Sequence, residues 1–256
     1  MPYWGSFFVV IVALVVVLIV LTRLTERALE AGPEGRAQIG DSDDPDAHEI
    51  GTAELYLNVV LSQGLFGAVI IGTIWWLDVP IQPLGVGTGD LEPIALVVLG
   101  VVFGAVLYLL NEASVSLLDL LGIDYSEELR ALLAPSSIAG WLVLLLVVLP
   151  VIAAFEELLF RAVLIGAATA ATGWSPWLFA LVSSLIFAVG HGVQGTGGIL
   201  VTGVLGFFLA VAFILTESLL VVIVAHYIIN ASEFILNEGI GIDPFSAVAT
   251  NLRSVR

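Results

Sequence analysis

Long apolar runs are the feature that most constrains how this chain can fold. The first, YWGSFFVVIVALVVVLIVL at residues 3–21, approaches the roughly 20 residues that an α-helix needs to cross the core of a bilayer. Strands of a membrane barrel would instead alternate apolar and polar residues. The sequence therefore predicts an all-α, polytopic bundle of transmembrane helices in the cell membrane. The mean hydropathy of +1.10 and the 59% share of hydrophobic residues agree with this prediction.

We expect seven membrane spans, or eight if the longest apolar segment divides. That segment covers residues 138–171 and contains Pro150, so it is either one long kinked helix or two helices that meet near the proline. The other expected spans are residues 3–21, 54–76, 93–110, 175–190, 198–215 and 218–236. Residues 111–137 are expected to form an acidic connector with a short surface helix.

The charged residues limit the classes of function. The net charge is −16, all seven basic residues are arginine, and no cysteine is present. Nucleic-acid binding is excluded because no basic patch exists to neutralise phosphates, and thiol chemistry is excluded as well. The acid-rich, lysine-free composition predicts a high-salt environment, as in a halophilic archaeon. The polar loop at 22–53, with DSDDPDAHE, is interpreted as a solvated linker, and its His48 as a solvated residue.

Six of the arginines predict how the chain lies in the membrane. With seven spans and an outside N-terminus, all six fall on the cytoplasmic side, as the positive-inside rule requires. They are Arg23, Arg27, Arg36, Arg130, Arg253 and Arg256. The seventh, Arg161, lies inside an apolar segment and needs another explanation.

That arginine belongs to AAFEELLFRAV, residues 153–163, where ionisable groups stand at bilayer depth. Each such group costs about 3 kcal/mol on insertion scales unless it is paired or faces a cavity. Glu157 and Arg161 are four residues apart and can pair along one helix face. Glu156 points about 100° away and has no such partner. One carboxylate is then structural, and the other is a candidate general base.

Two histidines and an amide occupy later apolar segments. His191 follows Phe187 in FAVGH, and His226 and Asn230 share a helix face in HYIIN, with Glu233 close to the same stripe. These groups can activate a water and stabilise an oxyanion, or they can bond neighbouring helices together. A zinc ion held by Glu156, His191 and His226 is a further alternative by ligand type.

Other hydrolytic sites are excluded by their missing motifs. The sequence has no H-E-x-x-H of the zincins and no glycine-flanked serine elbow.

The polar segments together carry a family resemblance. EELLFR fits E-E-x-x-x-R, FAVGH fits F-x-x-x-H, and HYIIN fits H-x-x-x-N. In this order they resemble the three motifs of the CPBP family of CAAX prenyl proteases and bacteriocin-processing intramembrane proteases, also called the Abi family. The resemblance covers residues 138–236.

The resemblance implies an all-helical membrane protein with a conical cavity open to the membrane and cytosol. Glu156 would be the general base, and His191 would help to hold the attacking water. His226 and Asn230 would form the oxyanion site, while Glu157 and Arg161 would shape the motif helix. Both a metalloprotease and a metal-free glutamate mechanism stay open. The glycine-rich GHGVQGTGG, residues 190–198 around and after His191, is interpreted as an interfacial loop or a mobile gate.

The leading hypothesis is an intramembrane endopeptidase that cleaves a membrane-associated peptide or protein, of CAAX type or another. Membrane lipid and that substrate are the expected partners. The alternatives are a non-catalytic scaffold or immunity protein and a proton-coupled transporter, although no second E-E-x-x-x-R-like segment suggests the internal symmetry of a transporter. The expected parts of the chain are a first helix with its acidic loop (1–53), helices with a connector (54–137), the catalytic core (138–240) and a tail (241–256).

Overall fold

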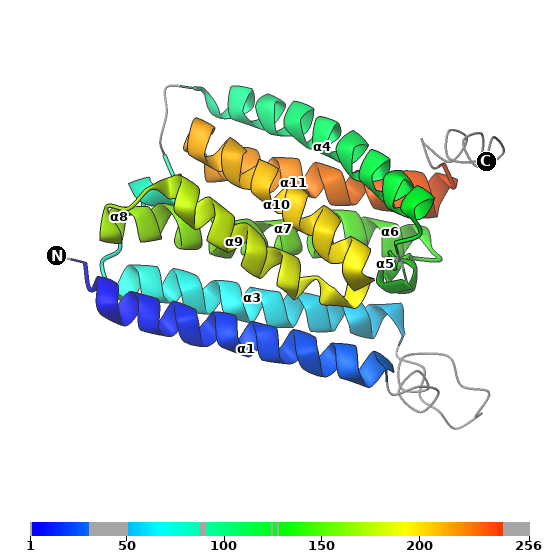
Figure 1. Cartoon of the computed structure of the whole chain (residues 1–256), viewed down its shortest axis with the longest axis horizontal. Helices are drawn as coiled ribbons and strands as arrows, with labels where there is room; N and C mark the ends of the chain where they lie inside the picture. The colour runs from blue at the N-terminus through cyan, green and yellow to red at the C-terminus, as the bar shows by residue number, and fades with distance from the viewer. Residues whose placement is uncertain (1, 31–50, 88–90, 124, 127, 243–256) are drawn as a thin grey trace.

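The structure, a computed structural model, describes residues 2–30, 51–87, 91–123, 125–126 and 128–242. These residues form a bundle of roughly aligned helices without strands (Figure 1). The main helices are α1 (Trp4–Glu30), α3 (Thr52–Trp76), α4 (Pro93–Leu121), α9 (Pro176–Gly190), α10 (Gly195–Thr216) and α11 (Leu219–Glu233), which continues as the π-helical η5 (Phe234–Ile240). Short helices are η1 (Gln82–Leu84), α5 (Glu128–Leu133) and η4 (Gly192–Gln194).

The longest apolar segment is one continuous helical run from Ile138 to Thr172. It consists of α6 (Ile138–Val143), η2 (Leu144–Val148), α7 (Leu149–Glu157), η3 (Leu158–Ala167) and α8 (Ala168–Thr172), of which η2 and η3 are π-helical. Pro150 has no N–H for the carbonyl four residues earlier, and the preceding π-turn accommodates that loss. The division near Pro150 that would give an eighth span does not occur.

The chain is a multi-pass membrane protein. Six helices in the described part are long and apolar enough to cross a membrane, and the shorter apolar α9 adds a further segment. Together they correspond to the seven expected spans. Arg23 and Arg27 at the end of α1 lie at the same end of the bundle as α5 with Arg130, opposite the N-terminus (Figure 1). These arginines thus share one end of the bundle, as the predicted topology requires, and the side of the membrane on which that end lies stays a prediction. The predictions on His48, Arg36, Arg253 and Arg256 lie outside the described residues.

Helix α4 corrects one boundary. The third span was expected to end at residue 110, but α4 continues to Leu121, where Gly122 adopts a left-handed conformation (φ 71°). The helix continues because Asn111 and Glu112 are buried, 2% and 5% exposed, and bond to groups on α11 and η5. The first part of the predicted connector is therefore helix inside the bundle. The short helix expected further on is α5.

Close packing of α4 on α11 fixes the height and rotation of the third motif. A Cβ atom at Gly100 would lie 2.8 Å from the carbonyl oxygen of Val221, and one at Gly104 would lie 2.6 Å from that of Ala225. Small residues allow two membrane helices to approach this closely. Since Ala225 directly precedes His226, the contact determines where that imidazole lies.

Candidate active site

The first and third motifs meet at Glu157. Its Oε1 accepts a hydrogen bond from Arg161 Nη1 at 2.9 Å, on the same helix, and one from His226 Nδ1 at 2.7 Å, on α11. The exposed fractions of Glu157, Arg161 and His226 are 0%, 1% and 6%. The expected pair between Glu157 and Arg161 is present. The bond from His226 was not predicted, and it makes Glu157 the link between two helices.

Arg161 joins this pair to the second motif. Its Nη2 donates to the carbonyl oxygen of Gly206 on α10 at 2.9 Å, and its guanidinium carbon lies 4.8 Å from the ring centre of Phe187 on α9. Gly206 has no side chain to obstruct this arrangement, since a Cβ atom there would lie 2.9 Å from the Phe187 ring. Three helices are thus joined around one buried cation.

Glu156 lies against the other side of His226. Its Oε2 is 3.6 Å from His226 Nε2, and its side chain is 13% exposed. Because His226 donates its Nδ1–H to a carboxylate, Nε2 is the ring atom that faces Glu156. Within the described residues, the buried Oε2 of Glu156 has no hydrogen-bond partner. A buried carboxylate oxygen in this position is ready to accept a proton or to bind a water.

His191 follows the last turn of α9. Its Nδ1 lies 2.8 Å from the carbonyl oxygen of Phe187, which can only accept, so Nδ1 is the donor and Nε2 is an acceptor. The two rings lie 4.5 Å apart between centres. The glycine-rich stretch after His191 forms the single turn η4 and the start of α10, with Gly195 at φ 77°.

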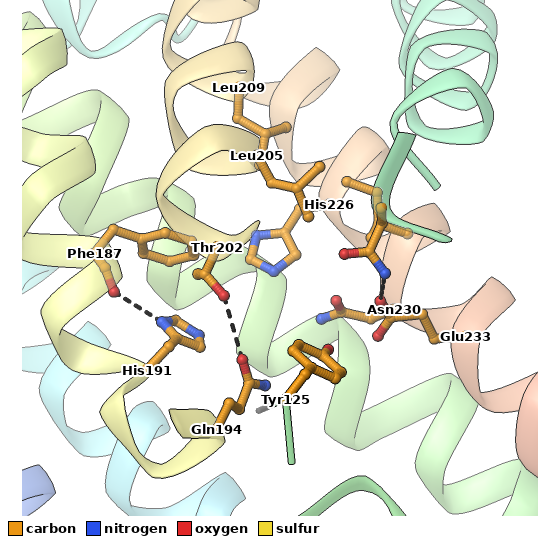
Figure 2. A pocket seen from close by; sticks show the side chains of 12 residues that line it. Tyr125, Phe187, His191, Gln194, Thr202, Leu205, Leu209, His226, Asn230 and Glu233 are labelled. Atoms are coloured by element: carbon orange, nitrogen blue, oxygen red, sulfur yellow. Dashed lines mark hydrogen bonds between the residues drawn. The ribbon is translucent and has the colours of Figure 1, made fainter. Parts of the chain in front are cut away.

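A cavity of about 80 Å³ lies beside these groups (Figure 2). Of the predicted site residues, His191, His226 and Asn230 line it, whereas Glu156, Glu157 and Arg161 do not. The remaining lining residues are Asn111, Tyr125, Phe187, Gln194, Thr202, Leu205, Leu209, Ile229 and Glu233. Three of the six predicted residues therefore line the cavity. Glu157 and Arg161 are buried behind His226, and Glu156, whose side chain is 13% exposed, faces Nε2 of the same ring.

Several lining residues were missed by the sequence interpretation. Asn111 and Tyr125 were assigned to the connector, where polarity and aromatic content predict nothing specific. Gln194 and Thr202 bond to each other at 3.3 Å around the glycine-rich turn. For Glu233 the sequence does hold a signal, because its spacing of seven residues from His226 places both on one helix face.

The three predicted metal ligands do not fit a metal site as they lie. Within the part of the chain that the structure describes, no group of three or more His, Asp or Glu side chains is arranged to hold a metal ion. Glu156 Oε2 and His226 Nε2 lie 3.6 Å apart, but among the described residues His191 does not join them as a third ligand. We therefore assign no reaction step to a metal.

Part of the chain is similar to a known protein family. Residues 138–232 match the family model described as type II CAAX prenyl endopeptidase Rce1-like. The matched segment contains the residues that carry the three motifs, which are Glu156, Glu157, Arg161, Phe187, His191, His226 and Asn230. No curated protein and no solved structure matches the chain.

Proposed function

We propose that the chain is an intramembrane endopeptidase that uses Glu156 to activate water, since residues 138–232 match the family model described as type II CAAX prenyl endopeptidase Rce1-like. One observation carries this proposal. Glu156 and His226, which are 70 positions apart in the chain, face each other at 3.6 Å beside a cavity at membrane depth. Burying ionisable side chains at this depth costs free energy, so such residues usually have a function. A hydrolytic site is a function that needs these groups.

In the proposed reaction, Glu156 takes a proton from a water whose oxygen attacks the carbonyl carbon of the scissile peptide bond. The carbonyl oxygen becomes the oxyanion of a tetrahedral intermediate. Collapse of this intermediate breaks the C–N bond, and Glu156 returns its proton to the departing amine nitrogen. Glu156 ends in the state in which it started, so no further reactant is needed.

The residues around the cavity suit the supporting roles. His191 donates Nδ1–H to Phe187, so its Nε2 can accept a hydrogen bond from the attacking water. Asn230 lies one turn beyond His226 on α11 and offers amide N–H groups to the oxyanion. Because Nδ1 of His226 donates to Glu157, Nε2 is the ring nitrogen that is left to form a hydrogen bond with the reacting atoms.

Glu157 and Arg161 act as positioning residues in this scheme. Glu157 fixes the tautomer and rotation of the His226 ring, much as a carboxylate orients the histidine of a hydrolytic triad. Arg161 neutralises Glu157 and is held in turn by Gly206 and Phe187. Both are buried away from the cavity, so neither touches the substrate.

The test is substrate trapping with Glu156→Gln in native membranes. We expect this variant to fold, to cleave nothing, and to accumulate proteins that wild-type membranes process, which mass spectrometry would identify. Glu112→Gln is the matched control, because Glu112 is also a carboxylate inside the bundle but bonds to Asn237 on η5, whereas Glu156 faces His226. Full cleavage by Glu156→Gln of a substrate that the wild type cleaves would reject the assignment.

A second variant separates catalysis from binding alone. If Glu156, His191 and Asn230 are replaced together and the cellular phenotype persists, the protein acts as a non-catalytic scaffold. Loss of the phenotype with retained membrane insertion and retained size in detergent supports the protease.

A further inference from the structure

The cavity has an acidic wall that the proposed reaction does not use. Glu233, at the end of α11, lines it together with Asn111 of α4, and the amide Nδ2 of Asn111 donates a hydrogen bond to Glu233 Oε1. Figure 2 shows Glu233 on the far side of His226 from His191, beyond Asn230. Glu233 therefore lies in the same cavity as His191, His226 and Asn230, at the end away from His191.

We propose that Glu233, oriented by Asn111, is a specificity subsite that binds a cationic side chain of the substrate about three residues from the scissile bond. This inference rests on the proposed protease function, because it names the class of substrate that the same cavity accepts. The class is a membrane-associated peptide with an arginine or lysine at that distance.

The distance follows from the helix. His226, Asn230 and Glu233 are spaced i, i+4 and i+7, so they share one face of α11. Seven residues of α-helix rise about 10 Å. An extended peptide advances roughly 3.3 Å per residue, so a bond cleaved beside His226 places a side chain about three residues away near Glu233.

The positive charge that we expect on the substrate side chain follows from the residues that line the cavity. Among the described residues that line the cavity, Glu233 is the one carboxylate, the other ionisable side chains are those of His191, His226 and Tyr125, and none is arginine. A hydrogen bond between a cation and a carboxylate is about twice as strong as a neutral one. A substrate carboxylate at the same place would meet a like charge, which disfavours it.

A purely structural role for Glu233 is the rival explanation, since its bond to Asn111 also joins α4 to α11. That connection is duplicated one turn further along. Asn237 donates to Glu112 Oε1 at 3.3 Å, and Tyr108 donates to Asn237 Oδ1 at 3.5 Å. Glu233→Gln removes the negative charge and retains an oxygen that can accept from Asn111, so it tests recognition while this bond between the helices is kept.

The experiment uses detergent-solubilised protein and membrane-anchored model peptides, in S-prenylated and unprenylated sets. Each peptide carries arginine, its neutral isostere citrulline or glutamate at one of four positions on either side of the cleaved bond. For the wild type we expect kcat/KM to be 10- to 100-fold higher with arginine than with citrulline at one position, two to four residues from that bond. Glutamate should be the worst residue there.

Two variants then test whether Glu233 causes the preference for arginine over citrulline. Glu233→Gln should bring the arginine-to-citrulline ratio to about 1, while Glu112→Gln should leave it unchanged. Equal rates for arginine and citrulline at every position in the wild type would overturn the inference, even if Glu233→Gln failed to fold. A preference that survives Glu233→Gln would overturn it as well.

A binding measurement separates this inference from the proposed function. Anisotropy of the same labelled peptides on Glu156→Gln reports recognition without cleavage. If the wild type cleaves no peptide of the set, the protease proposal fails. The binding measurement then decides the inference about Glu233. Tighter binding of arginine than citrulline that Glu233→Gln abolishes supports it, and equal binding refutes it.

Discussion

Removal of the buried arginine is the sharpest test of how the site is held together. Arg161→Met keeps an unbranched side chain of helix-forming type and removes three interactions at once. These are the 2.9 Å ion pair to Glu157, the 2.9 Å bond to Gly206 and the contact with the Phe187 ring. Glu157, which is 0% exposed, then keeps only the bond from His226.

The expected loss of unfolding free energy is about 3–5 kcal/mol, the usual cost of leaving one partner of a buried pair without its counter-charge. Most of that cost comes from the isolated carboxylate rather than from the pair itself. The double variant Arg161→Met with Glu157→Gln should therefore recover part of it, with a coupling of about 1–3 kcal/mol in the double-mutant cycle. Without that coupling, the two single losses would simply add.

The assay is reversible unfolding in mixed micelles, followed by helical circular dichroism, for the wild type, both single variants and the double variant. A loss below about 1 kcal/mol for Arg161→Met would mean that the guanidinium is not the buried counter-charge. Strict additivity in the cycle would mean that Glu157 and Arg161 do not depend on each other. Either result would refute the reasoning about the positioning residues.

Two further predictions test neighbouring parts of the site. Glu157→Gln should lower kcat by on the order of 10²- to 10⁴-fold with little change in KM, because His226 loses the carboxylate that fixes its ring; a kcat within about twofold of the wild type would contradict this. Gly104→Leu should destabilise the protein by about 1–3 kcal/mol, because a Cβ atom there would lie 2.6 Å from the Ala225 carbonyl. Gly64→Leu is its control, since nothing lies within 4 Å of a Cβ atom at Gly64, and equal losses in the two variants would contradict the packing argument.

The sequence predicts those features that depend on local periodicity. Apolar runs give the spans, and the spacing of four residues gives the pair between Glu157 and Arg161. The bond between Glu157 and His226 joins positions 69 residues apart, and periodicity states which face a residue occupies without stating which helix it meets. Its prediction would need the order of the helices in the bundle.

The same limit explains the error at α4. Asn111 and Glu112 are indistinguishable from the start of a polar connector, because the groups that bury them lie more than 120 residues later. A membrane helix usually ends where its polar residues reach water. It can continue past them when other helices of the bundle supply hydrogen-bond partners. Sequence alone does not distinguish these two cases.

These contacts also mean that residues 138–232, which carry the motifs, do not build the site alone. Asn111 of α4 and Tyr125 line the cavity from outside that segment. On the other side, Phe66 of α3 lies with its ring centre 6.3 Å from that of Phe155, the residue directly before Glu156. A carboxylate that must accept one water and exclude the lipid depends on both walls. The earlier helices are therefore part of the proposed active site, and an isolated 138–240 segment should lack the cavity even though it has every motif.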